Sequence, residues 1–122
     1  MENKKPTILV AEDMESNYLL VSYLLRSDYS VMWAHDGSEA LDLYRANRID
    51  LILMDIRMPR MSGLMATEQI RKTDDKTPII ALTAFAFESD REQAVKAGCT
   101  DFLPKPINAE LLLTKIKKYI QA

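Results

Sequence analysis

Carboxylate, hydroxyl and ammonium side chains stand at the ends of short apolar runs in this sequence. The residues concerned are Glu12 with Asp13, Asp55, Thr83 and Lys105. Any one of them alone is an ordinary solvated residue, but four runs that end in this way indicate a site. Three carboxylates gathered in one crevice repel one another, so protons or a cation must neutralise them. The set therefore predicts a site that depends on a bound cation.

The class of cation follows from the residue types that the chain offers. With one histidine and one cysteine in 122 residues, a zinc cluster is excluded. An all-oxygen site favours Mg2+, with Mn2+ as an alternative, and Mg2+ keeps several waters and is shared with phosphate groups. Lys105 would add a second positive charge for an anion, and the Thr83 hydroxyl a neutral donor. Together these residues predict a place for a phosphoryl group, whose acceptor must be a carboxylate.

Strands and helices that alternate along the chain must bring these residues together. Five apolar runs are too short for helices, and most lack a polar face, as strands buried on both sides do. We expect strands at Thr7–Ala11, Ser30–Ala34, Leu51–Met54, Ile79–Leu82 and Asp101–Leu103. The segments between them have helical spacing and recognisable ends. The predicted helix starts are at Asp36 with Glu39, Ser89 with Glu92, and Asn108, and Gly98 is a predicted helix end.

This alternation predicts the α/β fold class. We expect a flavodoxin-like, doubly wound (βα)5 fold, with five parallel strands in the order 2-1-3-4-5 and right-handed crossovers. Ligands of such open sheets bind beyond the carboxyl ends of the strands. Four of the five predicted strands deliver a carboxylate, a hydroxyl or an ammonium group to that edge.

Composition limits the other functions. Residues 1–122 fit a single domain with a core of about 6–121, because 48% of the residues are hydrophobic and 28% are charged. The sequence has no apolar run near the ~20 residues of a membrane span, and a cytoplasmic domain without membrane contact is expected. The single Cys99 suits a reducing compartment. A net charge of -2 without a basic stripe argues against direct nucleic-acid binding.

Four ordered motifs resemble those of response-regulator receiver domains of two-component systems. They are Glu12-Asp13 after ILVA, LILMDIRMPRMSG at 51–63, ALTA at 81–84 and FLPKP at 102–106. The sequences of two segments, AEDMESNYLL at 11–20 and residues 81–107, further resemble those of receivers at the C-terminus of hybrid sensor histidine kinases. The resemblance covers about residues 6–121, in the same order and spacing.

The resemblance implies a role for each residue of the site. Asp55 would be the phosphoacceptor. Asp13, Asp55 and the backbone carbonyl of Arg57 would coordinate Mg2+, with Glu12 acting directly or through water. This acidic group is the part of the site that would receive the metal ion.

Other residues are expected to sense the phosphoryl group. By the same resemblance, Thr83 and Lys105 would bind phosphoryl oxygens, and Phe102 would be the aromatic switch residue. Arg57 and Phe85 lie two residues after Asp55 and Thr83. They are predicted to tune the lifetime of the acyl phosphate.

The implied function is that of a phosphoacceptor signalling domain in a phosphorelay. A histidine kinase or a histidine phosphotransfer domain would be the partner, and the surface of the fourth helix, fifth strand and fifth helix would switch and could form a homodimer. The domain would not be an enzyme in the conventional sense, beyond assisting transfer to Asp55 and slow self-dephosphorylation. It would be either cut from a hybrid kinase, whose parent could be membrane-anchored, or a stand-alone regulator.

Three alternative functions agree less well with the sequence. A small aspartyl-phosphate phosphohydrolase would use Asp55 as nucleophile, but Arg57 stands where such enzymes place a general-acid aspartate. A pseudo-receiver that only binds protein would not need the complete acidic, threonine and lysine set. A flavin-binding protein would need a Ser/Thr/Gly-rich phosphate loop after the first strand, and the sequence has none.

Overall fold

The computed structural model describes residues 5–84 and 88–120. The five strands are β1 Thr7–Ala11, β2 Ser30–Ala34, β3 Leu51–Asp55, β4 Ile79–Thr83 and β5 Asp101–Pro104. The helices are α1 Glu15–Leu25, α2 Gly37–Ala46, α3 Gly63–Arg71, α4 Glu88–Ala97 and α5 Ala109–Tyr119. Within the described ranges no helix is long and apolar enough to cross a lipid bilayer.

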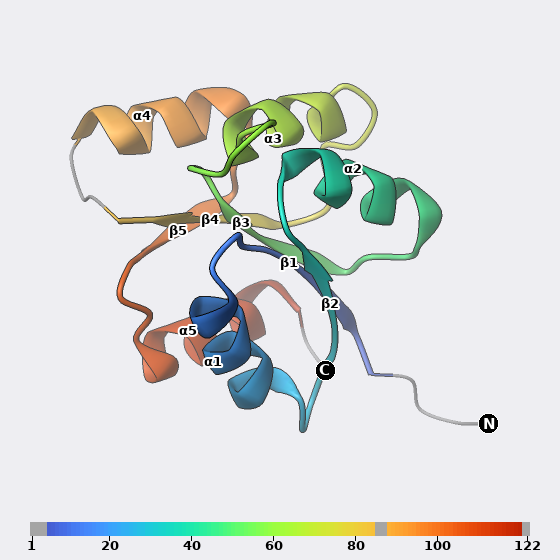
Figure 1. Cartoon of the computed structure of the whole chain (residues 1–122), viewed down its shortest axis with the longest axis vertical. Coiled ribbons are helices and arrows are strands. Elements are labelled where there is room, and N and C mark those ends of the chain that lie inside the picture. The colour runs from blue at the N-terminus through green and yellow to red at the C-terminus, as the bar shows by residue number, and fades with distance from the viewer. Residues whose placement is uncertain (1–4, 85–87, 121–122) are drawn as a thin grey trace.

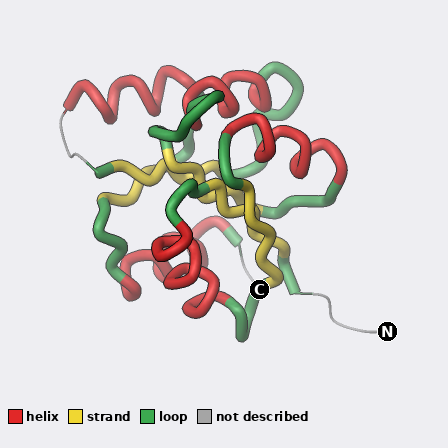
Figure 2. Tube along the Cα trace, in the orientation of Figure 1, coloured by secondary structure: helices red, strands yellow, loops and turns green. Residues whose placement is uncertain are grey.

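The molecule has three layers. The five strands are all parallel and lie in the order β2-β1-β3-β4-β5, as predicted. Helices α2, α3 and α4 cover one face of the sheet, and α1 and α5 cover the other (Figure 1; the layers are also clear in the tube of Figure 2). The predicted flavodoxin-like (βα)5 fold is therefore confirmed.

Burial on both faces explains why the strands lack a polar side. Ile8 and Val10 of β1 point into the core shared with α1 and α5, whereas Leu9 and Ala11 point into the core shared with α2 and α3. All four side chains are fully buried. Since successive residues of a strand face opposite sides, each strand needs apolar residues at every position. Register pairs Ala11 of β1 with Met54 of β3, which sets their carboxyl ends side by side.

Local signals define most of the helix ends. The side chains of Asp36, Ser62 and Asn108 accept hydrogen bonds from backbone amides in the first turns of α2, α3 and α5. Gly98 has φ +110 and ends α4, as a left-handed C-cap does. The prediction that Ser89 caps α4 is wrong, because the helix already begins at Glu88. With Glu88 and Asp90, the first turn of α4 carries acidic residues that its dipole favours.

Three strands extend one residue further than predicted. Strands β3 and β4 include Asp55 and Thr83 as their last residues, and β5 includes Pro104. Asp55 and Thr83 are thus part of the sheet, whereas Glu12, Asp13 and Lys105 directly follow the strands β1 and β5.

Candidate phosphoryl-acceptor and metal site

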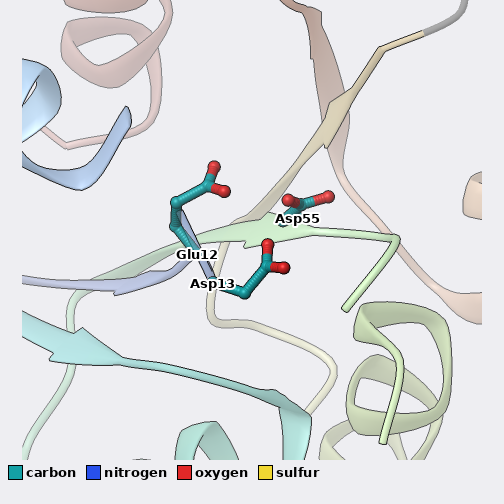
Figure 3. A group of neighbouring side chains, drawn as sticks. All are labelled: Glu12, Asp13 and Asp55. Carbon is teal, nitrogen blue, oxygen red and sulfur yellow. The ribbon is translucent and has the colours of Figure 1, made fainter. Parts of the chain in front are cut away.

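The acidic residues predicted from the sequence meet at the carboxyl ends of β1 and β3. One carboxylate oxygen from each of Glu12, Asp13 and Asp55 lies within 4.8 Å of the others. Figure 3 shows Glu12 and Asp13 at the end of β1, with the Asp55 carboxyl group beside them at the end of β3. Glu12 and Asp55 are buried, whereas Asp13 is exposed. The site therefore has a closed base and an open side.

Lys105 places an ammonium group between the two buried acids. Its Nζ is 2.9 Å from Oε1 of Glu12 and 2.7 Å from Oδ2 of Asp55. Burial opposes the charge of this lysine, but its hydrogen bonds to Asp55 and Glu12 outweigh that cost and raise its pKa. Lys105 therefore keeps its positive charge inside the site. The peptide bond that follows it, Lys105–Pro106, is cis.

Glu12 is held on both its backbone and its side chain. The indole N–H of Trp33 donates to the carbonyl oxygen of Glu12 at 2.8 Å, and the amide of Met14 donates to its Oε2 at 3.2 Å. Burial raises the pKa of Glu12, and the nearby Asp55 charge adds to this, against the lowering effect of Lys105. Proton uptake is thus easier at Glu12 than at an ordinary glutamate when no second cation is present.

The positioning role of Trp33 was not predicted from the sequence. Its ring stacks on Tyr18, with the ring centroids 4.2 Å apart, and lies 4.0 Å from the ring of His35. The side chain of Trp33 is partly buried. The local sequence does not predict the hydrogen bond from Trp33 to Glu12, because this bond depends on the pairing of β1 with β2.

The loop after β3 closes tightly over Asp55. The amide of Arg57 donates to Oδ1 of Asp55 at 3.0 Å. A Cβ atom at Gly63 would lie 2.0 Å from the carbonyl oxygen of Asp55, so only glycine permits this approach. Arg60 adopts a left-handed φ of 63, and its guanidinium pairs with Asp36 at the start of α2. The motif at 51–63 therefore encodes the shape of the loop as well as the acid.

Thr83 and Phe102 lie on the neighbouring strands. Thr83 ends β4 and is buried, and its carbonyl oxygen accepts a hydrogen bond from the amide of Lys105 at 2.7 Å. Phe102 of β5 lies beneath α4, with the guanidinium carbon of Arg91 4.4 Å from the centroid of its ring. The predicted role of Phe85 falls outside the described residues.

The side chain of Arg57 reaches the first turn of α4. Its guanidinium lies 3.5 Å from Oδ1 of Asp90, a buried residue in the first turn of α4. Asp90 was not recognised from the sequence, because an aspartate near a helix start is usually a solvated residue. His35 is exposed and pairs with Glu39 in the loop and first turn of α2, so it is not part of a helical bundle of the kind that carries a phosphohistidine. Burial raises the pKa of the Cys99 thiol, so this cysteine is not a reactive thiolate.

The donor set fits a magnesium ion. Three carboxylates against one lysine leave a formal charge of -2 if all are ionised, which a divalent cation balances. All the side-chain donors are oxygens, as hard cations prefer. Because Asp13 is exposed, a metal bound there would keep waters on its open side, as Mg2+ usually does.

The sequence profile of the response regulator receiver domain matches residues 8–117. The chain belongs to this family. It is a receiver domain of a two-component phosphorelay. Among curated relatives, the polar-differentiation response regulator DivK of Brucella anthropi is 39% identical over 117 residues, which cover 93% of this chain and 95% of DivK.

Two solved receiver domains are similar in sequence and in fold. The receiver of sensor histidine kinase PA1611 from Pseudomonas aeruginosa, solved with a magnesium ion in its active-site cleft, is 37% identical with a TM-score of 0.89, and the match covers 97% of this chain and 99% of that one. The receiver of Ssk1 from Saccharomyces cerevisiae, solved with the histidine phosphotransfer protein Ypd1, is 31% identical with a TM-score of 0.89, covering 95% and 89%.

The relatives differ in length. The chain spans most of DivK, about half of several other response regulators, and 7% of a hybrid signal transduction histidine kinase from Dictyostelium discoideum. The matches to the Dictyostelium hybrid kinase and to the PA1611 receiver confirm the resemblance to kinase receivers. The response regulator DivK is similar to a comparable degree.

Proposed function

We propose that Asp55 is the phosphoacceptor of this receiver domain, and that Asp13, Asp55 and the Arg57 carbonyl hold Mg2+ with Glu12 beside them. The observation that carries the proposal is the position of Asp55, buried between the acidic pair at the end of β1 and the ammonium group of Lys105. Among the described acids, only Glu12 and Asp55 belong to this carboxylate cluster and also pair with Lys105, and Asp55 is the one at the shorter distance, 2.7 Å against 2.9 Å.

The reaction is a displacement at phosphorus. A carboxylate oxygen of Asp55 attacks the phosphoryl group of a phosphohistidine, the O–P bond forms, and the P–N bond breaks. The leaving imidazole keeps the electron pair and takes up a proton. Lys105 neutralises charge on the transferred oxygens, and the Thr83 hydroxyl donates a hydrogen bond to one of them. Mg2+, or Mn2+ in its place, would supply a further positive charge to the same oxygens.

The product state would change the surface formed by α4, β5 and α5. Lys105 leaves its two acids to meet the phosphoryl group, and Thr83 and Phe102 follow on adjacent strands. The same surface is the one through which a homodimer would form. This switch supports a signalling role in which the acyl phosphate is kept and is slowly hydrolysed by the domain itself.

The donor would be a histidine kinase or a histidine phosphotransfer domain. The Ssk1 receiver is solved with a phosphotransfer protein, which supports a partner of this kind for the present chain. The domain would be either part of a hybrid kinase or a stand-alone regulator, and it would act in the cytoplasm.

The phosphohydrolase alternative is less well supported. A hydrolase needs a general acid close to the nucleophile, and Arg57 occupies the position two residues after Asp55 with its side chain turned towards Asp90. Steady turnover of phosphate esters would favour the hydrolase over the receiver.

Intact mass spectrometry tests the proposal. The wild type incubated with phosphoramidate and Mg2+ should gain one phosphoryl group, and it should gain none when the metal is chelated. Asp55→Asn should remove the gain. Asp74→Asn, which changes an acid at the opposite end of the sheet, is the matched control and should label like the wild type. Undiminished labelling of Asp55→Asn would contradict the assignment.

A further inference from the structure

The carboxylate of Asp90 is buried, and among the described residues it has one charged partner, Arg57. Its side chain is 8% exposed, and Oδ1 lies 3.5 Å from the guanidinium of Arg57. Oδ2 is buried and has no hydrogen-bond partner among the residues that the structure describes. A buried carboxylate without partners is costly, so Asp90 depends on the positive charge of Arg57. That charge sits on a side chain that is 63% exposed and therefore has room to move.

Helix α4 buries few large side chains among the described residues. Besides Asp90, its buried residues are Ala94 and Ala97, and Val95 is 65% exposed. Helix α5 instead buries Leu112 and Ile116, which are fully enclosed. Small alanine side chains bury little apolar area, so they contribute less to docking than leucine or isoleucine. The position of the first turn of α4 therefore depends on polar contacts, of which the Arg57–Asp90 pair and the Arg91–Phe102 contact are two.

The same turn contacts the predicted switch residue. Arg91 follows Asp90, and its guanidinium lies over the ring of Phe102 at 4.4 Å. Two neighbouring residues of α4 therefore connect the loop after Asp55 with the aromatic side chain of β5. A movement of this turn would alter the groove that Phe102 lines together with Glu88, Arg91, Glu92, Val95 and Lys96.

Arg57 is also next to the acceptor. Its amide donates to Oδ1 of Asp55, so its backbone lies against the carboxylate that would carry the phosphoryl group. A phosphoryl group brings more negative charge than a carboxylate and binds arginine in a fork. The phosphoryl group would therefore compete with Asp90 for the same guanidinium.

We propose that the Arg57–Asp90 ion pair holds the first turn of α4 in its unphosphorylated position, and that the phosphoryl group draws Arg57 away and releases that turn. The proposal rests on Asp55 being the phosphoacceptor. Release follows because Asp90, once it has lost its partner, is stabilised only by reaching water. Arg57 is a positioning residue here, since it acts on the output helix through Asp90.

Amide hydrogen exchange of α4, detected by NMR, tests the pair in the unphosphorylated protein. Arg57→Gln should speed exchange of the α4 amides about five-fold, the shift in a two-state equilibrium expected for loss of a partly exposed ion pair. Arg57→Lys, which keeps the charge, should restore most of the protection. Arg60→Gln is the matched control, because Arg60 is an exposed arginine of the same loop that pairs with Asp36.

The phosphorylated wild type completes the test. Its α4 amides should exchange faster than those of the unphosphorylated protein, and the side-chain Nε–H resonance of Arg57 should shift. If Arg57→Gln leaves α4 exchange at the wild-type rate, or changes it no more than Arg60→Gln does, the inference is overturned. If the wild type gains no phosphoryl group on Asp55, the proposed function itself fails, and the comparison of Arg57→Gln with Arg60→Gln still reports on the pair.

Discussion

Acidic side chains at the two ends of the β-sheet are held in opposite ways. At the amino ends, Asp74 of the loop between α3 and β4 accepts hydrogen bonds from Tyr44, from the amides of Lys76 and Thr77, and from the Thr77 hydroxyl. At the carboxyl ends, three carboxylates lie together and one lysine pairs with two of them, Glu12 and Asp55. The first arrangement is complete within the chain, whereas the second lacks positive charge. A cluster that its own fold leaves incomplete is where a metal ion and a phosphoryl group fit.

The pKa values follow the same division. Hydrogen bonds from Thr77 and Tyr44 hold the pKa of Asp74 well below its usual range. Burial instead raises the pKa of Glu12, and the neighbouring Asp55 adds to that effect. The surroundings of Asp74 therefore stabilise its negative charge, whereas those of Glu12 disfavour a negative charge until a further cation binds.

The largest effect is expected on the free energy of unfolding, which should respond differently to a substitution at each end of the sheet. Asp74→Asn should lower the free energy of unfolding by about 2 kcal/mol, because it weakens hydrogen bonds to a charged acceptor. Asp55→Asn should leave stability unchanged or raise it, since it removes a charge from a crowded acidic group. Urea denaturation of both variants checks this. If Asp55→Asn lowered the free energy of unfolding as much as Asp74→Asn does, the two ends of the sheet would not differ in how they hold their acids.

Much of this organisation is predictable from the sequence, for a physical reason. Parallel strands bring their carboxyl ends to one edge, so the strand positions alone predict that Glu12, Asp13, Asp55, Thr83 and Lys105 gather there. The amino-end cluster was missed, because Tyr44 and Asp74 meet only through the packing of the folded chain. The Arg57–Asp90 pair was missed for the same reason, since neither residue is unusual in its local sequence.

Loss of Lys105 should expose the shortage of positive charge. Without Mg2+, Lys105→Ala should reduce stability by about 1 kcal/mol, because Glu12 and Asp55 then face each other unpaired. Mg2+ should restore part of the loss. Phosphorylation of this variant should still proceed, but the NMR shifts that it causes at Thr83, in α4 and at Phe102 should shrink. Shifts equal to those of the wild type would show that Lys105 does not couple the site to that surface.

Alkaline pH should weaken the contribution of Tyr44 to the cluster around Asp74. Burial and the hydrogen bond to Asp74 raise the pKa of Tyr44 to about 12, from its ordinary value of 10.0. A raised pKa means that the folded state retains this proton longer, so the contribution of Tyr44 is full below pH 10 and is lost as the pH rises through about 12. Denaturation of wild type and Tyr44→Phe from pH 9 to 12 should show the stability difference shrinking over roughly that range. A constant difference would contradict the raised pKa.

The smallest expected effect concerns the lifetime of the acyl phosphate. Arg57→Asn should speed decay of phospho-Asp55 about three-fold, because a guanidinium against the phosphoryl oxygens obstructs the in-line approach of water. The Arg57→Asn/Phe85→Ser variant should decay faster still. Phosphoryl loss at fixed Mg2+ can be followed by intact mass. Equal decay in wild type and both variants would mean that neither residue gates water.

We propose that the incomplete acidic cluster takes a phosphoryl group on one residue, Asp55. Borohydride reduction of the phosphorylated wild type, followed by peptide mass spectrometry, tests this most directly because it converts an aspartyl phosphate to homoserine at its own position. We expect homoserine at position 55 only, dependent on Mg2+ during labelling. Homoserine at position 13, or label that resists reduction and maps to His35, would contradict the account.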